Sequence, residues 1–366
     1  MTVLVAPDKF KGSLTAAQVA AAVAAGLRTA LPGEPVRELP VADGGDGTVA
    51  AAVAAGFRRI PVRVSGPTGR RITAFFALRG DVAVVELAEA SGLHRLPGGL
   101  PAPLTASSYG TGELIAAAVA AGASRVVLGV GGSAGTDGGA GMLMALGARV
   151  LDSSGADVPL GGIGLASVSS VDLSGLPTVD ISLACDVDNP LLGPSGAAAV
   201  YGPQKGALPE DVAVLEAGLC RWSEVLGASF ATVPGAGAAG GVGFAALAAL
   251  RARVRPGIAL LLDLLGFEAA VRDARLVITG EGSLDTQSLH GKAPVGVLRA
   301  ATAAGVPTVA VAGRCLLPPA EWRAAGFAAV HALADLEPDA TRCMTHAAPL
   351  LRQLAEGLAR EHIAVS

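Results

Sequence analysis

The chain repeatedly alternates a short apolar run, a glycine-rich turn and an alanine-rich stretch, and this alternation constrains its fold most strongly. Residues 2–7, 36–41, 125–130 and 275–279 are apolar runs of strand length, and a loop and a segment of helical composition follow each of them. Strands that alternate with helices along a chain form a parallel sheet with helices on both of its faces. We therefore predict an α/β protein.

Local signals set the ends of several elements. Thr15 and Gln18 have the spacing of a capping box, which predicts a helix that begins there and runs to about residue 29. The segment 62–78 has a central Gly-Pro-Thr-Gly turn between alternating runs and is predicted to be a hairpin. Asp137 is expected to be the N-cap of a helix, and Pro294 is expected in the first turn of another.

The middle of the chain differs from its two ends. The first two strand–helix units and the last two are alike, whereas the hairpin and the irregular segments after it suggest a mixed sheet. We predict a discontinuous Rossmann-like parallel-sheet domain, residues 1–65 plus 268–366, with a second mixed α/β domain, residues 66–267, inserted in it.

Composition excludes some classes of protein. A net charge of −4 and 3% aromatic residues disfavour nucleic-acid binding. Alanine is a large part of the 51% hydrophobic content, and no apolar run approaches the roughly 20 residues of a membrane span. The four cysteines show neither CxxC nor zinc spacing, which indicates free thiols in a reducing compartment, so we expect a cytoplasmic protein.

Lysine is rare, and its positions are informative. Only four of the 27 basic residues are lysine, and all of them fall in glycine-rich loops: Lys9, Lys11, Lys205 and Lys292. Arginine presents a planar fork, whereas lysine is a compact and mobile point charge, so the two are not interchangeable at a site. We expect at least three of these loops to share one cleft.

Two loops near the N-terminus carry charged side chains. PDKFKGS follows the first strand and leads into a capped helix, where Lys11 would suit a phosphate or a carboxylate. DGGDGT, which holds Asp43 and Asp46, would bind Mg²⁺ or deprotonate a hydroxyl. A solvated surface turn and an Asp-Gly helix start are the plain alternatives.

Two loops in the middle of the chain add further polar groups. GVGGSAGTDGGAG, residues 129–141, would cradle phosphate with its backbone amides, although no Walker A lysine follows it. CDVDNP holds Asp188 and the only asparagine, Asn189, and would bind a metal or substrate hydroxyls. Tight packing of a helix on a sheet and a simple turn are the alternatives.

The loop TGEGSLDTQSLHGKAP follows the strand 275–279. Glu281 and Asp285 are carboxylates suited to a metal or to base catalysis, and Lys292 stands at the start of a helix. His290 lies nearby, but a lone histidine is more often structural than catalytic.

One motif favours a different function. GAGAAG, residues 235–240, fits GxGxxG, and Asp263 follows at nearly the spacing of a dinucleotide-binding site, which would indicate an NAD-dependent dehydrogenase. Pro234 and a short preceding strand do not fit that motif, and this interpretation leaves the four lysines without a role.

Taken together, the blocks PDKFKGS, DGGDGT, GVGGSAGTDGGAGMLMALG, ACDVDNPLLGPSGAAAVYGPQKGA, GAGAAGGVGFA and ITGEGSLDTQSLHGKAPVGV resemble those of bacterial glycerate kinases (type I, D-glycerate kinase), in order, from Pro7 to about Val297. The resemblance implies ATP-dependent phosphorylation of D-glycerate with Mg²⁺, in the interdomain cleft of a two-domain α/β protein. It favours 2-phosphoglycerate over 3-phosphoglycerate as the product. The chain departs from the family pattern at Lys9, Asp46 and Gly135, so Lys11 and Asp43 are better candidates than their neighbours Lys9 and Asp46.

The predicted roles combine the residues with this resemblance. Catalytic roles are expected for Lys11, Asp43, Asp137, Asp188 and Lys292; nucleotide binding for Gly131, Gly132, Ser133, Lys205, Glu281 and Asp285; substrate binding for Arg70 and Asn189; and metal binding for Asp43 and Asp285. The expected ligands are ATP, Mg²⁺ and D-glycerate, with neither nucleic acid nor membrane as a partner and the oligomeric state left open. The alternatives are the dehydrogenase and a sugar-acid-binding protein without catalysis.

Overall fold

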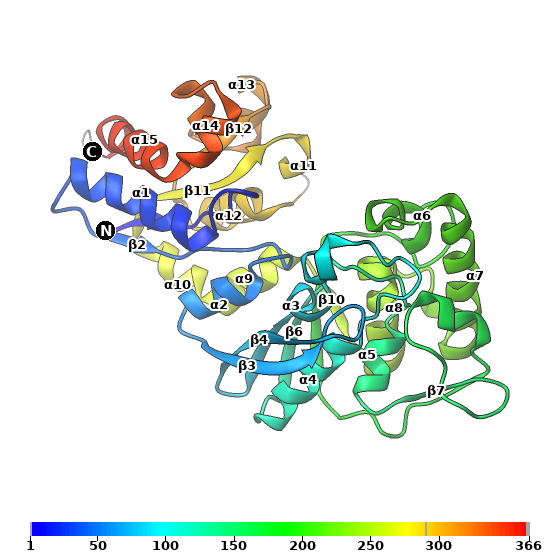
Figure 1. Ribbon diagram of the computed structural model, residues 1–366. Coiled ribbons are helices and arrows are strands. Elements are labelled where there is room, and N and C mark those ends of the chain that lie inside the picture. Colours follow the sequence, from blue (N-terminus) through cyan, green and yellow to red (C-terminus); the bar gives the residue numbers. More distant parts are fainter. Residues whose placement is uncertain (1, 290, 364–366) are drawn as a thin grey trace. The chain divides into compact units, whose positions relative to one another are not determined.

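The computed structural model describes residues 2–289 and 291–363, and the chain divides into two compact units. The first unit comprises Met1–Asp43, Ala50–Ala55 and Ile258–Ser366, and the second comprises Gly44–Val49 and Gly56–Gly257. Figure 1 shows both units as sheets with helices around them. The predicted folding domains, 1–65 plus 268–366 and 66–267, stay a prediction.

The first unit is built on a five-stranded sheet. Its order is β13 (Ala329–Ala332), β12 (Thr308–Cys315), β11 (Ala274–Leu284), β1 (Thr2–Val5) and β2 (Val36–Glu38), and every pairing between these strands is parallel. Alternate residues of β1 face two different cores. Val3 and Val5 pack in a cluster with Leu351, whereas Leu4 packs in a cluster with Val297.

Helices supply the other side of each core. The cluster of Val3 and Val5 includes residues of α1 (Ala16–Ala30) and α15 (Ala347–His362), and the cluster of Leu4 includes residues of α9 (Gly257–Leu265), α10 (Phe267–Arg272) and α12 (Ala293–Ala303). The unit also holds α2 (Thr48–Ala54, in part), α11 (Thr286–Leu289), α13 (Pro319–Ala325) and α14 (Ala340–Thr345). The prediction of a parallel sheet covered on both faces is therefore confirmed.

Two predicted helix starts are confirmed, and one strand is longer than expected. Thr15 and Gln18 form the capping box of α1, and Pro294 lies in the first turn of α12. The strand predicted over 275–279 continues to Leu284, because its backbone goes on pairing with β12 where the side chains are no longer apolar. This extension places Glu281 on a strand rather than in a loop.

The second unit is built on a mixed six-stranded sheet. Its order is β10 (Arg253–Arg255), β9 (Asp180–Ala184), β6 (Arg125–Gly129), β5 (Val82–Glu86), β4 (Arg71–Arg79) and β3 (Arg58–Ser65). The first four strands are parallel, and β4 is antiparallel to both of its neighbours, so the hairpin predicted over 62–78 is confirmed. A small antiparallel pair, β7 (Arg149–Leu151) and β8 (Ser170–Asp172), completes the strands. A parallel sheet and a second mixed sheet confirm the predicted fold class.

The helices of the second unit are α3 (Leu87–Ser91), α4 (Tyr109–Ala120), α5 (Ala140–Ala145), α6 (Ala197–Tyr201), α7 (Pro209–Leu226) and α8 (Ala238–Leu250). The prediction that Asp137 is an N-cap was wrong, because Gly139 precedes α5 with a φ of +74°. The Asp137 carboxylate accepts hydrogen bonds from Ser107 and Ser108, which lie about thirty positions earlier in the chain.

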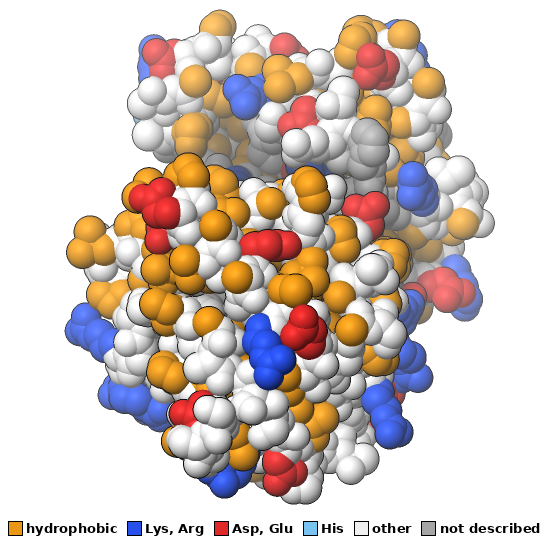
Figure 2. Space-filling model, turned by 90° about the vertical axis from the view of Figure 1, so that its right-hand side faces the viewer, with side chains coloured by type: hydrophobic (Ala, Val, Ile, Leu, Met, Phe, Trp, Pro, Cys, Tyr) orange, Lys and Arg blue, Asp and Glu red, His pale blue; other side chains and the backbone are white. Residues whose placement is uncertain are grey.

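Within residues 2–289 and 291–363, no helix combines the length and the apolar character needed to cross a membrane. On the face shown in Figure 2, arginine and lysine side chains occur singly or in small groups among apolar and uncharged ones.

Candidate active site

The carboxyl ends of β1 and β11 bring three acidic residues of the first unit to one edge of its sheet. Asp8 follows β1, and its backbone N–H donates to the Gly280 carbonyl of β11 at 2.8 Å. Glu281 is the next residue of β11, and Asp43 follows β2 along the chain. Ligands of open parallel sheets bind at this edge, beyond the carboxyl ends of the strands.

Asp8 is a buried acid that the sequence analysis did not select. Its side chain is 6% exposed, and burial raises its pKa to about 7; the Lys9 ammonium opposes this rise, and the carboxylates of Asp43 and Glu281 add to it. A carboxyl group with a pKa near 7 can accept a proton at neutral pH and release it again. The sequence signal that would have found it is an acid directly after the first strand of a parallel sheet.

Glu281 is also buried, and burial raises its pKa, although the Ser288 hydroxyl and the Lys292 ammonium lower it. Its Oε1 atom has no hydrogen-bond partner among the residues that the structure describes. A buried oxygen without a partner is costly, so a bound cation or hydrogen-bond donor would stabilise it.

The carboxylates of this edge do not form a closed metal cage. Within the described part of the chain, the only three metal-binding side chains with ligand atoms within 4.8 Å of one another are His331, Glu361 and His362. Mg²⁺ usually keeps several waters and binds one or two carboxylates together with substrate phosphates. The edge therefore suits a cation that arrives with a phosphate ligand.

Three of the four lysines belong to this unit. Lys9 forms an ion pair with Asp8 at 4.0 Å. Lys11 is exposed, and its backbone passes Gly282 of β11 so closely that a Cβ there would lie 3.1 Å from the Lys11 nitrogen. Lys292 precedes α12, and its Nζ donates to Gln287 Oε1 at 3.4 Å. His290 lies outside the described residues.

Asp285 serves as a local cap. Its Oδ1 accepts from the Ser288 N–H at 3.2 Å, and its own N–H donates to the Ser288 hydroxyl at 3.0 Å. One carboxylate oxygen is thus engaged at the start of α11.

A second polar edge lies in the second unit, where the glycine loop 129–141 follows β6. A Cβ at Gly131 would lie 2.5 Å from the Gly45 Cα, so the loops DGGDGT and 129–141 are in contact. Glu86, at the end of β5, accepts from the N–H groups of Gly47 and Val49 at 3.1 Å. Burial raises the pKa of Glu86 to about 7 against these two hydrogen bonds. The sequence did not predict the role of Glu86, whose carboxylate accepts hydrogen bonds at the start of α2.

Asp137 and Lys205 lie inside the second unit. The Asp137 carboxylate accepts from the N–H of Ser108, from the hydroxyls of Ser107 and Ser108, and from the N–H of Gly139, at 2.7–3.1 Å. Lys205 is 2% exposed, its Nζ donates to the Gly135 carbonyl, and burial lowers its pKa to about 7. Protein groups thus surround both side chains, so their predicted direct roles stay predictions.

The remaining predicted residues of this unit are more open. Arg70 and Asp188 are exposed, as is Gly132, whereas Ser133 is buried. The Asn189 amide donates to the Ser195 carbonyl at 2.8 Å and accepts from the Tyr201 hydroxyl at 2.6 Å, so it holds its own loop in shape.

The GAGAAG segment lacks the surroundings of a dinucleotide site. A short 3-10 turn (Ala228–Phe230) precedes it in place of a strand, and Asp263 lies within α9 rather than at the end of a strand. The Gly237 N–H donates to the Asn189 carbonyl, and Gly240 packs against Gly135. The loop thus packs against the protein itself, which does not favour the dehydrogenase alternative.

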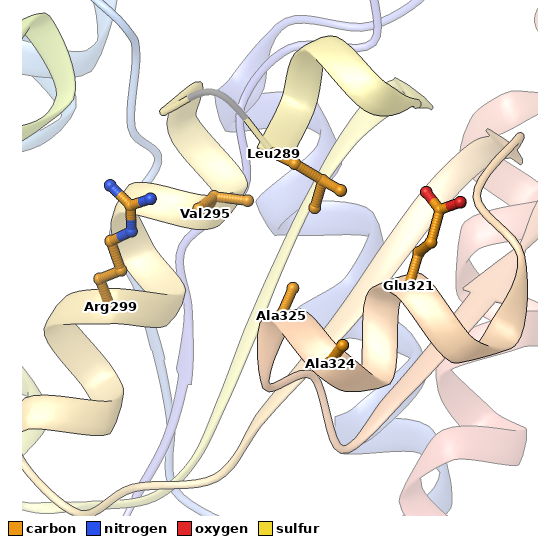
Figure 3. A pocket seen from close by; sticks show the side chains of 6 residues that line it. All are labelled: Leu289, Val295, Arg299, Glu321, Ala324 and Ala325. Carbon is orange, nitrogen blue, oxygen red and sulfur yellow. The ribbon is translucent and has the colours of Figure 1, made fainter.

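A separate pocket of about 400 Å³ lies between α11, α12 and α13 of the first unit. Leu289, Val295, Ala324 and Ala325 line it, with Arg299 and Glu321 at opposite sides (Figure 3). None of the predicted site residues is among these six.

The profile of the Glycerate kinase family matches residues 3–362 of the chain. The chain belongs to this family. It is 48% identical over 324 residues to the glycerate kinase of Bacillus subtilis (strain 168), with 86% of this chain and 85% of the relative covered. It is 43% identical over 325 residues to the glycerate 2-kinase of Escherichia coli (strain K12), with 86% and 85% covered.

The fold is that of a solved relative in the same family. The crystal structure of a "putative glycerate kinase 2" from Salmonella typhimurium LT2 superposes with a TM-score of 0.85 at 42% identity, over 98% of this chain and 97% of that one. The resemblance inferred from the sequence blocks is therefore confirmed.

Proposed function

We propose that the chain phosphorylates D-glycerate with ATP by in-line transfer of the γ-phosphoryl group to a glycerate hydroxyl. The observation that carries this proposal is the buried acid Asp8, which lies at the carboxyl edge of the parallel sheet in the same unit as Lys11 and Lys292. Phosphoryl transfer requires cations to bind the phosphates and a group to accept or orient the hydroxyl proton.

Asp8 is the proposed proton acceptor. Because its pKa is raised to about 7, it is partly ionised at neutral pH and has appreciable basicity. Asp43 and Glu281 keep negative charge close to it, which favours proton uptake as the hydroxyl attacks.

The lysines supply the positive charge. Lys11 is exposed beside β11, and Lys292 precedes α12, so both ammonium groups are able to approach a triphosphate. Compact ammonium groups stabilise charge that develops on the transferring phosphoryl oxygens.

The acidic edge fits Mg²⁺ in its chemistry. The oxygens that would hold it together with the nucleotide phosphates are those of Asp43 and Asp285 and the Oε1 of Glu281, which has no partner among the described residues. When bound, the ion would neutralise part of the phosphate charge. Asp43 and Asp285 were predicted as its ligands, and Glu281 joins them in this proposal.

The second unit is proposed to bind and orient the reactants. Gly131 and Gly132 would present backbone amides, with Ser133 beside them, to a phosphate, while Asp137 and Lys205 keep this loop in shape from behind. Arg70, Asp188 and Asn189 are the proposed contacts for the glycerate carboxylate and hydroxyls. Catalysis in an interdomain cleft remains part of the proposal.

The proposed product is 2-phosphoglycerate, in keeping with the name glycerate 2-kinase of the Escherichia coli relative. The test is a coupled assay of ADP release with D-glycerate, ATP and Mg²⁺. For comparison, one reaction has L-glycerate in place of D-glycerate, and another has NAD⁺ in place of ATP. Enolase added without a mutase converts 2-phosphoglycerate and leaves 3-phosphoglycerate unchanged. Absence of D-glycerate-dependent ADP release from folded protein would overturn the proposal, and product that enolase cannot use would reassign the phosphorylated carbon.

A further inference from the structure

Two histidines and a glutamate meet in the first unit, at the edge strand β13. His331 lies on β13, and His362 is the last residue of α15, with 3.2 Å between the two Nε2 atoms. The Oε2 atom of Glu361 lies 3.9 Å from His331 Nε2 and 3.7 Å from His362 Nε2. In the sheet order, β12 separates β13 from β11, the strand that carries Glu281.

The spacing of these atoms suits ligands around one small ion. Zinc binds histidine nitrogen at about 2.0–2.1 Å in a tetrahedron, whose ligand atoms are then about 3.3–3.4 Å apart. The separation of 3.2 Å between the imidazole nitrogens is close to this edge length. The carboxylate oxygen needs to move only a few tenths of an ångström, and the Glu361 side chain is 61% exposed and therefore free to do so.

The exposure of the group also suits a metal ion. Each imidazole is 25% exposed, so solvent reaches the group and can supply a remaining ligand. The Asp335 carboxylate lies near enough to His331 to add negative charge to the surroundings.

The ligand types distinguish this group from the acidic edge. Imidazole nitrogen favours zinc, copper, nickel and related transition metals, whereas Mg²⁺ prefers oxygen alone. A hydrogen bond between two neutral imidazoles explains the distance of 3.2 Å equally well, but it gives no role to the carboxylate beside both rings.

We propose that His331, Glu361 and His362 bind one divalent transition-metal ion of the zinc type, with water in the open position. The ion would link the last turn of α15 to the edge strand of the sheet. Such a link stabilises the folded state, because the ligands are brought together only there. This proposal does not depend on the proposed kinase activity.

The test uses the full, untagged chain after chelator treatment, with Co²⁺ as the spectroscopic probe and Zn²⁺ as its competitor. Excess Mg²⁺ in all samples occupies the oxygen sites. We expect one Co²⁺ per chain with the visible absorption of a four-coordinate site, displacement by Zn²⁺, and a higher melting temperature with Zn²⁺.

Variants locate the binding. His331→Gln and His362→Gln should each weaken Co²⁺ affinity by about tenfold or more, and Glu361→Gln should weaken it by a similar order. Glu361 is exposed, so its variant tests the site without disturbing the core. His346→Gln is the matched control, because His346 is exposed and lies at the opposite end of α15.

Melting temperatures in chelator establish that each variant is folded before binding is compared. Binding below one ion per chain, or unchanged affinity in both the Glu361→Gln and His362→Gln proteins, would overturn the proposal.

Discussion

The two units place similar residues in opposite situations. In the first unit, Asp8 and Glu281 are buried at a sheet edge, and the Oε1 of Glu281 has no partner within the described residues. In the second unit, Asp137 accepts four hydrogen bonds, and Lys205 donates to the Gly135 carbonyl of the glycine loop 129–141. Both sets come from glycine-rich stretches of the sequence, so composition alone does not separate residues proposed to react from residues that support the loops.

The two sets of side chains differ in how many hydrogen bonds or ligand contacts they can still make. A carboxylate whose lone pairs are all engaged contributes to stability and has little capacity left for a ligand. Burial with few hydrogen-bond donors raises the pKa of a carboxyl group, because its ionised form is then costly. Such groups are typical of functional sites. We therefore propose direct chemistry for Asp8 and Glu281 and a supporting role for Asp137 and Lys205, and the following variants test that proposal.

The largest effect is expected for Asp8→Asn. Without a proton acceptor, turnover should fall by about 10²–10⁴. The same substitution should raise stability at high pH. The pKa of Asp8 is about 7 in the folded state, above its ordinary value of 3.8, so the folded state binds more protons between these values. The free energy of unfolding should then decline as pH rises from about 4 to 7, and the asparagine should remove this decline, worth on the order of 2–4 kcal/mol at pH 8.

Kinetics and urea unfolding at pH 5 and pH 8 measure both effects. Asp81→Asn is the control, because Asp81 is an exposed acid whose pKa is lowered to about 2, chiefly by the Arg125 guanidinium. Asp81→Asn should leave turnover unchanged. In the unchanged protein, the ionised Asp81 carboxylate stabilises the fold, and this contribution is lost only at acidic pH. Normal turnover in Asp8→Asn would remove Asp8 from the mechanism.

Lys11→Ala is expected to reduce kcat by about 10²–10³, because a cation that stabilises the transferring phosphoryl group is lost. Lys9→Ala is the matched variant from the same loop. Its main expected effect is a shift of the pH–rate profile to higher pH, since the Lys9 ammonium lowers the pKa of Asp8. Equal losses in both variants would contradict the distinction between the two lysines.

Gly240→Ala tests the packing of the second unit. Gly240 has a φ of +69°, and a Cβ there would lie 2.3 Å from the Gly135 carbonyl oxygen; Gly266 has a φ of +71° and nothing within 4 Å. Gly266→Ala should cost about 1 kcal/mol from backbone strain alone, and Gly240→Ala about 3 kcal/mol or more. Urea unfolding of the two proteins gives the difference, and similar costs would show that the two loops are not in contact.

Asp137→Asn should destabilise the protein by about 2 kcal/mol, because an amide nitrogen replaces an oxygen that accepts buried hydrogen bonds. Asp152→Asn is the control, since Asp152 accepts from Ser154 and Ala156 at an exposed turn, and it should cost much less. Turnover of Asp137→Asn should follow the loss of folded protein. A large fall in kcat at full stability would instead give Asp137 a direct catalytic role.

Features set by neighbouring residues were predictable from sequence. The capping box of Thr15 and Gln18 and the hairpin of β3 and β4 depend on residues close in the chain, and both are confirmed. The alternation of strands and helices likewise predicted the parallel sheet of the first unit.

Contacts between residues far apart in the chain were not predictable from the sequence. Asp137 resembles a helix cap in sequence, yet Ser107 and Ser108 bind it, and no local pattern shows this pairing. Lys205 is buried against Gly135 and Gly240, which are distant in the sequence, so its sequence signal, a lysine in a glycine-rich loop, was the same as that of Lys11. The charged residues around Asp8 are typical of a solvated loop, whereas its burial accompanies a contact with Gly280 of β11, which is distant in the sequence.

The extension of β11 has a consequence for ligand binding. Glu281 is paired with Ala312 of β12, and the preceding Gly280 carbonyl accepts from Asp8, so the backbone there is fastened on both sides before any ligand arrives. Its carboxylate is thus preorganised, and little conformational entropy is lost when a ligand meets it. Variation in substrate preference within such a scaffold should therefore arise in the surrounding turns, while this strand acts as a fixed reference point.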